Sequence, residues 1–443
     1  MPTSQKPSSL PPNDTRPWPA PGVQMDNARV FLTECARSRA RTLLLPDKDA
    51  DGLCSALIVH HTLIQLGAAP ASLAVHFPAK GSNIHAAASR AAIAASRARF
   101  VIATDQGSRG GPAIAPDPAV RTLVLDHHWS EGFPDGAVVC SSAACPPVAT
   151  SATLAFEVCQ PLLDDTRRMG QGNAAAMDVR VVQERLEWLC AIGTMGDLGT
   201  SFKWTPPFPD VRECLRRWTK KTLGEAVALV NAPRRSAEYD VETAWRALLH
   251  CTSPKDLVSP RTGGDVVRLF EAREAVAAET ARCSRSPPAF SGDGRVALVR
   301  VSSGAQIHPL IATRWAGSLK GPRLEIVMCA NDGYTPGMTN FSCRIAKNRR
   351  GGGGADNPEV DIIGALKEYA ARVPGLREAM GDNFARGHKE ASGGIVRTEQ
   401  FEKLWDVMAG AEREGDEPAR KKRKGTKGQP VQKNTLEGWL KAV

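Results

Sequence analysis

Hydrophobic and polar positions succeed one another along the chain in a way that predicts two α/β regions. Between residues 26 and 208, short apolar runs at 42–45, 73–77, 100–103 and 122–125 have the length of buried strands. Stretches at 25–40, 53–66 and 86–95 carry apolar residues at helical spacing. Strand and helix in repeated succession predict a doubly wound parallel sheet.

A second, smaller α/β region is predicted at 291–408. Its strands are expected at 295–301, 324–329 and 338–346, with a helix at 307–319 and a later helix opened by Asn357 as cap and Pro358 in the first turn. Residues 209–290 have mostly helical patterns, so we expect a helical connector there. The polar compositions of 1–25 and 409–443 predict a disordered leader and a basic disordered tail.

Composition excludes several classes of protein. With 42% hydrophobic and 23% charged residues, the composition predicts folded domains rather than a disordered scaffold. The most apolar stretch, 86–103, is broken by three arginines, so we expect no membrane span. Residues 1–25 lack the apolar core of a signal peptide, and eleven cysteines without a C-x-x-C pair favour reduced, intracellular thiols over a zinc ribbon or a disulfide framework.

Most of the net charge of +10 lies in the tail. From Arg420 onward, eight basic residues face Glu437 alone, which accounts for +7. The folded part is therefore nearly balanced, and phosphate binding there has to come from local arrangement rather than from net charge.

Acidic residues and histidines follow the predicted strands of the first region. Since the carboxyl ends of parallel strands form the ligand crevice of such a sheet, these side chains should converge at one edge. A helical stretch at 186–192 leads into one more acid. The residues concerned are Asp47, Asp49 and Asp51 after the first strand, Asp105 after the third, Asp126, His127 and His128 after the fourth, and Asp197 after the helix.

A metal site explains this clustering better than local structure does. A single Asp after a strand is usually a turn former or a helix cap. Four such positions at the ends of successive elements would gather carboxylates that repel one another unless cations lie among them. Carboxylate and imidazole ligands suit Mn²⁺ or Mg²⁺, so we predict a site for two divalent ions.

The same residues carry a resemblance to a known family. The segments 46–52 (PDKDADG), 104–108 (TDQGS), 125–128 (LDHH) and 193–197 (GTMGD) resemble, in order, motifs one to four of the DHH phosphoesterase superfamily, and the chain is most similar to RecJ-type single-strand nucleases. Residues 387–393 and 342–344 resemble the glycine-histidine signature and the serine/arginine strand of the DHH-associated domain. The resemblance implies a DHH catalytic domain at 26–208 and a substrate-binding domain at 291–408.

The resemblance also implies roles for single residues. It makes Asp105 the carboxylate that bridges two metals, with Asp49 on one metal and Asp51, His127 and Asp197 around the other. Asp126 would orient an imidazole, His128 would face the scissile phosphate, and Arg344, Gly387 and His388 would bind substrate. For Arg344, a surface salt bridge is an equally good interpretation.

One position departs from the family pattern. The family often has a His four residues before the acid that corresponds to Asp49, and here that residue is Leu45. We therefore expect a weaker first metal, or recruitment of Asp47 or water in its place.

The function implied is that of a two-metal exonuclease on single-stranded nucleic acid, with DNA as substrate and a 5′ to 3′ direction. The product would be a phosphomonoester and a shortened chain. A small-substrate phosphoesterase, acting on short oligonucleotides, nucleoside bisphosphates or pyrophosphate, is the alternative enzyme. An inactive nucleic-acid-binding scaffold is the alternative outside enzymes. For the glycines at 351–354, a flexible insertion is favoured over a phosphate-binding loop.

The tail carries two further signals. The cluster from Arg420 to Lys424 fits a nuclear import signal, with a nonspecific basic tract as the alternative. Leu436, Trp439 and Leu440 fall on one face of a helical turn and resemble a PCNA-interacting peptide, although Lys433 stands where Gln is usual. A disordered end is the alternative there.

Overall fold

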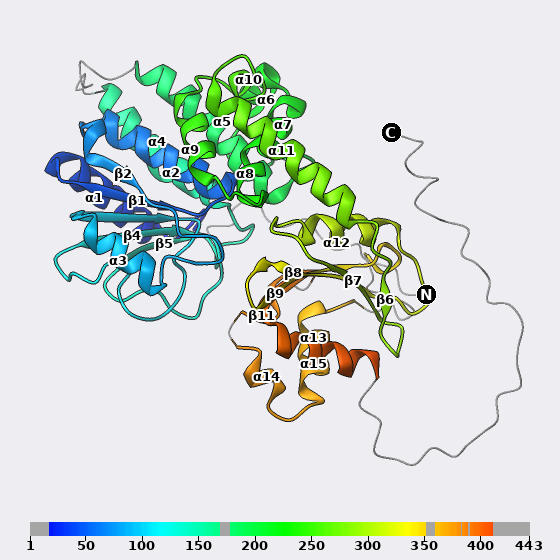
Figure 1. The fold of residues 1–443 in the computed structure, drawn as a ribbon. Coiled ribbons are helices and arrows are strands. Elements are labelled where there is room, and N and C mark those ends of the chain that lie inside the picture. The colour runs from blue at the N-terminus through cyan, green and yellow to red at the C-terminus, as the bar shows by residue number, and fades with distance from the viewer. Residues whose placement is uncertain (1–16, 169–177, 351–358, 382, 389, 411–443) are drawn as a thin grey trace, which may run out of the picture. The chain divides into compact units, whose positions relative to one another are not determined.

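A five-stranded parallel sheet organises the first of the two units into which the chain divides in this computed structural model (Figure 1). The structure describes residues 17–168, 178–350, 359–381, 383–388 and 390–410. The first unit comprises the described residues up to 234 together with 239–273. The second comprises 235–238 and the described residues from 274 onward.

The sheet of the first unit has the order β2-β1-β3-β4-β5, and all its neighbouring strands run parallel. Its strands are β1 (Thr42–Pro46), β2 (Leu73–Val75), β3 (Phe100–Thr104), β4 (Arg121–Asp126) and β5 (Val138–Ser141). Four of them lie at the predicted apolar runs, and the doubly wound α/β class is confirmed. The fifth was not predicted because it is a four-residue edge strand that is only partly buried.

Helices cover both faces of this sheet. Leu44 and Ile102 pack into the core on one face, and Leu43 and Val101 pack into the core on the other, as the two-residue period of a strand requires. The first core is built with α1 (Gly22–Ser38), α2 (Ala50–Gln65), α4 (Ser151–Arg168) and α5 (Val179–Leu198), and the second with α3 (Ala87–Ala95).

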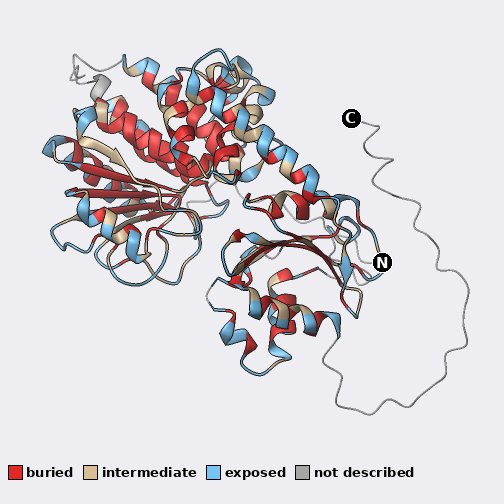
Figure 2. Ribbon diagram, viewed as in Figure 1, coloured by how far each residue is buried: buried red, intermediate tan, exposed pale blue. Residues whose placement is uncertain are grey.

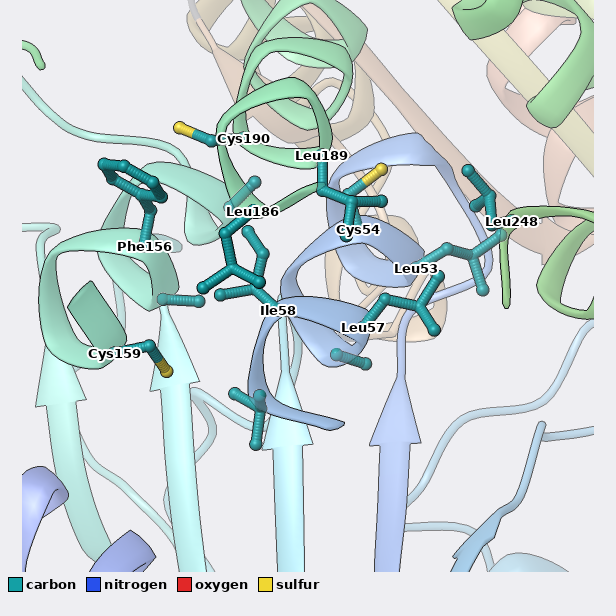
Figure 3. Close-up of a cluster of buried hydrophobic side chains, with 14 of the residues drawn as sticks. Leu53, Cys54, Leu57, Ile58, Phe156, Cys159, Leu186, Leu189, Cys190 and Leu248 are labelled. Carbon is teal, nitrogen blue, oxygen red and sulfur yellow. The ribbon is translucent and has the colours of Figure 1, made fainter. Parts of the chain in front are cut away.

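Helix α2 is the centre of the first core. It is buried along almost its whole length, as are the strands beneath it (Figure 2). Figure 3 shows Leu53, Leu57 and Ile58 of this helix among side chains from α4, α5 and α9 (Val241–His250). A helix with apolar residues on every side can be stable only when other elements surround it, so α2 holds its N-terminal end rigidly at the sheet edge.

The predicted helical connector is not a separate body. Its helices are α6 (Arg212–Trp218), α7 (Lys220–Val230), α8 (Ala232–Arg235), α9, α10 (Pro254–Leu257) and α11 (Gly264–Cys283). Apolar residues such as Leu223, Leu248 and Leu269 belong to the same core as α2, and most of this segment therefore completes the first unit. Helical spacing alone could not show which neighbour these apolar faces would pack against.

The second unit is built on a six-stranded mixed sheet of order β10-β11-β9-β8-β7-β6. Its strands are β6 (Ala289–Phe290), β7 (Val296–Val301), β8 (Ile326–Thr335), β9 (Met338–Ile345), β10 (Arg386–His388) and β11 (Ala391–Arg397). Only β7 and β8 pair in parallel. One face packs against α12 (His308–Ser318), and the other against α13 (Ile362–Ala371), α14 (Leu376–Ala379) and α15 (Thr398–Ala409).

Two local predictions are corrected. Helix α13 begins at Ile362 and is capped by Asp361, whose carboxylate accepts the backbone N–H of Gly364 at 3.0 Å. The expected cap, Asn357, and Pro358 lie outside the described residues. Residues 193–197 do not follow a helix but form the last turns of α5 itself.

Several predicted features cannot be located because they fall outside the described residues. These are the glycines at 351–354, the basic cluster from Arg420 to Lys424, and Leu436, Trp439 and Leu440. Within the described ranges, no helix combines the length and the apolar character that crossing a membrane requires. The eleven cysteines are all described, all buried and all free.

Candidate metal centre

The acids and histidines singled out in the sequence meet at the carboxyl edge of the parallel sheet. Asp47 and Asp49 follow β1, Asp105 follows β3, and Asp126 ends β4 just before His127 and His128. Asp51 lies in the first turn of α2, and Asp197 in the last turn of α5. The parallel register of the strands therefore brings together residues from four separate parts of the sequence.

Three overlapping groups of these side chains have the spacing of metal ligands. In each group, one potential ligand atom per residue lies within 4.8 Å of the others. Asp105 belongs to two groups, and so does His127, so neighbouring cation positions would share ligands. The groups are Asp51, His127 and Asp197; Asp47, Asp49 and Asp105; and Asp105, His127 and His128.

His127 shows most directly that the site suits a cation. Its Nε2 atom lies 3.2 Å from a carboxylate oxygen of Asp105 and 3.2 Å from one of Asp197. The same atom is buried and makes no hydrogen bond of proper geometry with any described residue. Although burial lowers it, the two carboxylates raise the pKa of His127 to about 11. The protonated ring balances part of the negative charge of these carboxylates, a charge that a divalent ion in the site would neutralise.

The buried carboxylates are held apart from water and close to one another. Burial, and then the negative charge of Asp197, raises the pKa of Asp51 to about 7. Burial, and then the negative charge of Asp51, raises the pKa of Asp105 well above its usual value. Carboxylates that resist ionisation when no cation is present are expected where a cation normally balances them.

The N-terminus of α4 positions two of these acids, and sequence reasoning missed it. Asp51 accepts the backbone N–H groups of Ser151 and Ala152 at 2.8 and 2.9 Å. The hydroxyl of Ser151 donates to Asp105 at 3.0 Å. A signal was present in Thr150, whose hydroxyl accepts the N–H of Thr153 at 3.3 Å in the manner of an N-cap.

Asp126 orients His128 rather than His127. One of its oxygens accepts the Nδ1–H of His128 at 2.8 Å and the backbone N–H groups of both histidines at 2.8 and 3.2 Å. Although burial raises it, the hydrogen bonds from His128 and Ser108 hold the pKa of Asp126 below its usual value. The side chain of His128 is 60% exposed, with Nδ1 3.9 Å from Asp105. His128 therefore stands between the acidic cluster and solvent.

The residue four positions before Asp49, where the family often has a histidine, is Leu45. Leu45 is fully buried in the apolar core between the sheet and α3, so this position offers no ligand. The carboxylate of Asp47 instead completes a group with Asp49 and Asp105. A weaker first metal, or Asp47 or water in place of the histidine, was expected here, and the geometry makes Asp47 a candidate ligand.

Two cationic side chains and an amide accompany Asp47 and Asp49. Lys48 belongs to the segment 46–52, whereas Asn231 and Arg234 carried no sequence motif. Lys48 lies 3.2 Å from Asp47, and Arg234 lies 3.6 Å from Asp49. Asn231 accepts the backbone N–H of Ala50 at 3.3 Å and the Nε–H of Arg234 at 2.9 Å. The segment between α7 and α8 thus fixes the start of α2 from a distance of 181 residues in sequence.

Glycines in the motifs allow the backbone to approach closely. A Cβ atom on Gly52 would lie 2.5 Å from the carbonyl oxygen of Asp47. On Gly193 it would lie 2.4 Å from the Cβ of Ala152 and 3.0 Å from a carboxylate oxygen of Asp51. These two positions require glycine because any side chain would push α2 or α5 away from the site.

The predicted substrate residues of the second unit lie on β9 and β10, the two strands that flank β11. In β9, Arg344 donates to the hydroxyl of Ser342 at 3.1 Å and to the carbonyl of Cys343 at 2.8 Å. Burial lowers the pKa of Arg344, and its guanidinium forms no ion pair with any described residue, so the geometry does not favour the salt-bridge interpretation. Gly387 lies in β10 with φ +109°, and a Cβ there would be 2.5 Å from the carbonyl oxygen of Ala391. His388 ends β10, and its side chain lies outside what the structure describes.

Comparison with known proteins identifies a family for part of the first unit. Residues 41–194 match the DHH family, N-terminal domain. The comparison with curated proteins finds no match.

Solved structures show the same fold at low sequence identity. RecJ from Thermus thermophilus in complex with Mn²⁺ is 18% identical with a TM-score of 0.60, and the match covers 90% of this chain but 56% of that one. An exonuclease RecJ bound to manganese is 18% identical with a TM-score of 0.56, covering 89% of this chain and 95% of that one. The DHH domain of a protein from a family of ribosomal proteins is 13% identical with a TM-score of 0.58, covering 88% and 90%. The chain thus spans little more than half the length of the Thermus RecJ. Residues 41–194 are a DHH-family N-terminal domain, and the chain has a RecJ-like fold.

Proposed function

We propose that this chain is a metal-dependent phosphodiesterase that acts as an exonuclease on single-stranded nucleic acid. The observation that carries the proposal is the sharing of Asp105 and His127 between neighbouring ligand groups at the carboxyl edge of the sheet. Shared ligands are the arrangement that two cations a few ångströms apart require.

The donor set fits two divalent ions such as Mn²⁺ or Mg²⁺. Asp51, His127 and Asp197 would hold one ion, and Asp47 and Asp49 the other. Asp105, which is grouped with His127 as well as with Asp49, would be their common ligand. Bound ions of this kind supply a water of lowered pKa and neutralise charge that develops on a phosphoryl oxygen.

His128 would bind the phosphate. Asp126 accepts the Nδ1–H of the ring at 2.8 Å, and although burial lowers it, this hydrogen bond raises the pKa of His128. In the protonated ring, Nε2–H is then the group that can donate a hydrogen bond to a phosphoryl oxygen. Because the same Asp126 oxygen accepts the backbone N–H of His128, the ring has little freedom to turn. Asp126 is therefore a positioning residue for His128.

In the second unit, Arg344 and Gly387 are proposed to bind the phosphate backbone of the substrate, together with His388. Arg344 is held by Ser342 and Cys343 and carries a positive charge on an inner strand of the sheet. Gly387 allows β10 to approach β11 closely, and β11 in turn pairs with β9, the strand that carries Arg344. Truncating Arg344 to Ala should raise KM for long substrates more than for dinucleotides.

DNA as the substrate and cleavage from the 5′ end are proposed on the resemblance of the sequence motifs to those of RecJ-type nucleases. The test is hydrolysis of 5′- and 3′-labelled single-stranded DNA and RNA of 2 to about 40 nucleotides by the purified chain with Mn²⁺. Progressive shortening of the 3′-labelled DNA from its 5′ end is the expected result. Cleavage of dinucleotides alone would favour the small-substrate phosphoesterase. Calorimetric Mn²⁺ binding without hydrolysis of any substrate would favour the inactive scaffold.

For the tail, we propose nuclear import through the cluster from Arg420 to Lys424 and binding of a PCNA-type sliding clamp through Leu436, Trp439 and Leu440. Deletion of residues 420–424 should move the protein to the cytoplasm. Alanine at the three apolar positions should abolish clamp binding, because a single helical turn has little else to bury and each anchor contributes about 2 kcal/mol or more. Calorimetry of a peptide of residues 430–443 with PCNA tests this, and absence of heat at high micromolar concentration would reject clamp binding.

A further inference from the structure

Trp129, the residue directly after His128, is the most exposed large hydrophobic side chain in the described part of the chain. It is 75% exposed, whereas Trp188 and Trp245 are buried in the core. Exposing most of an indole to water is unfavourable, so an exposed indole beside a polar site indicates a binding role.

The backbone that carries Trp129 is held firmly. Asp126 fixes the two residues before it through their N–H groups. After it, the hydroxyl of Ser130 donates to the carbonyl of Gly132 at 2.6 Å. The same loop forms a bridge to the loop that follows β3, with the N–H of Asp135 donating to Gly111 at 3.0 Å. The indole is therefore exposed on an ordered loop, and its exposure does not come from a frayed segment.

Other exposed apolar side chains also adjoin the candidate metal centre in sequence. Leu198, 40% exposed, follows Asp197. Val148, 39% exposed, stands three residues before Ser151, which donates to Asp105. The centre is thus acidic, and the exposed side chains that adjoin its residues in sequence are an indole and two aliphatic groups. A ligand that combines an anionic group with a flat apolar group has the complementary chemistry.

We infer that Trp129 stacks on a nucleobase of the single-stranded substrate beside the phosphodiester bound at the metal centre. The inference rests on the proposed function and adds to it the residue that recognises the base. A single exposed indole between His128 and Ser130 in sequence matches one planar base, whereas docking of a protein requires a contiguous apolar patch. Stacking of this kind accepts every base, because each has a π-face, so it gives affinity without sequence preference.

The experiment compares Trp129→Ala, Trp129→Phe and wild type on two sets of single-stranded DNA. One set is intact. The other consists of four oligonucleotides, each with a single abasic tetrahydrofuran nucleotide, placed at the first, second, third or fourth position from the end that is cleaved. Trp129→Ala should lower kcat/KM on intact DNA by roughly 10- to 100-fold. An abasic nucleotide at the stacked position should lower wild-type kcat/KM to a similar level while leaving the Ala variant unchanged. Trp129→Phe should recover most of the loss.

A matched control is Phe290→Ala, which removes a 49% exposed aromatic side chain from β6 of the second unit and should leave both substrates unaffected. Equal loss in Trp129→Ala on intact and abasic DNA at all four positions would overturn the inference, because the effect would then not depend on a base. Unchanged kcat/KM in Trp129→Ala would also overturn it, as would a change in oligomeric state as the sole effect. A wild type that cleaves none of these oligonucleotides would overturn the proposed function and this inference together.

Discussion

Replacing Asp51 by Asn should remove a pH-dependent loss of stability from the metal-free protein. Asp51 is fully buried, and its pKa is raised from 3.8 to about 7 by burial and by Asp197. A group whose pKa is higher in the folded than in the unfolded chain stabilises the fold while protonated, and this contribution is lost as the pH rises through the folded pKa. Ionisation of Asp51 should therefore destabilise the metal-free wild type progressively from about pH 4 to above pH 7.

The size of the effect follows from the shift. About three pKa units correspond to up to about 4 kcal/mol. The amide of Asp51→Asn cannot ionise, so the variant lacks this pH dependence. The variant also loses one of the two acceptors for the N–H groups of Ser151 and Ala152, at a cost of about 1–3 kcal/mol that does not change with pH. It should thus be the less stable protein at pH 4 and gain on the wild type as the pH rises.

The measurement is denaturant unfolding of EDTA-treated protein, followed by tryptophan fluorescence at several values between pH 4 and pH 9. The difference in unfolding free energy, variant minus wild type, should rise by about 4 kcal/mol over this range. Saturating Mn²⁺ should abolish the wild-type loss, since a cation would balance the ionised carboxylates. Asp117→Asn, at an exposed loop position, is the control. Parallel curves for Asp51→Asn and wild type would refute the account of a strained acidic cluster.

Three further changes test the site. Asp105→Asn should lower Mn²⁺-dependent hydrolysis by about 100-fold or more while leaving the circular dichroism spectrum unchanged, because Asn tolerates the φ of +61° that Asp105 adopts; near-normal turnover would remove Asp105 from the metal centre. Asp47→Asn should weaken Mn²⁺ binding by about 10-fold or more in calorimetry, and an unchanged affinity would show that Asp47 does not replace the family's histidine. Gly193→Ala should reduce unfolding free energy by about 1–3 kcal/mol because its Cβ would lie 2.4 Å from that of Ala152, whereas Gly22→Ala, with no atom within 4 Å, should be nearly neutral.

The sheet and its reactive edge could be predicted because the information is local. Each apolar run is short enough for one strand and is followed within a few residues by an acid or a histidine. Parallel order then fixes where those residues meet, so Asp49, Asp105 and His127 could be expected together without knowledge of any contact. The serine/arginine segment lies within the predicted strand at 338–346, whereas no strand was predicted for the glycine-histidine segment, which contributes to β10 and β11.

Contacts between distant segments could not be predicted in this way. Asp51 depends on the N–H of Ser151, 100 residues away in sequence, and Asn231 holds the start of α2 from 181 residues away. Periodicity shows that an α-helix has an apolar face, but it does not say which partner that face will meet. For residues 209–290, which were expected to form a helical connector, the pattern could not show that Leu223 and its neighbours pack into the core of the first unit.

The two adjacent histidines can have different roles because the carboxylate of Asp126 bonds to the ring of only one of them. Asp126 accepts the backbone N–H of both residues, which fixes the turn after β4, but it accepts a ring N–H only from His128. The ring of His127 lies between Asp105 and Asp197. Its Nε2 atom is 3.2 Å from a carboxylate oxygen of each but forms no hydrogen bond of good geometry with a described residue. The order Asp-His-His thus separates the proposed metal ligand His127 from the proposed phosphate-binding residue His128. An Asn at 126 would keep the size of the side chain but would put an amide N–H against one of its donors, so the separation depends on the carboxylate rather than on the shape of the turn.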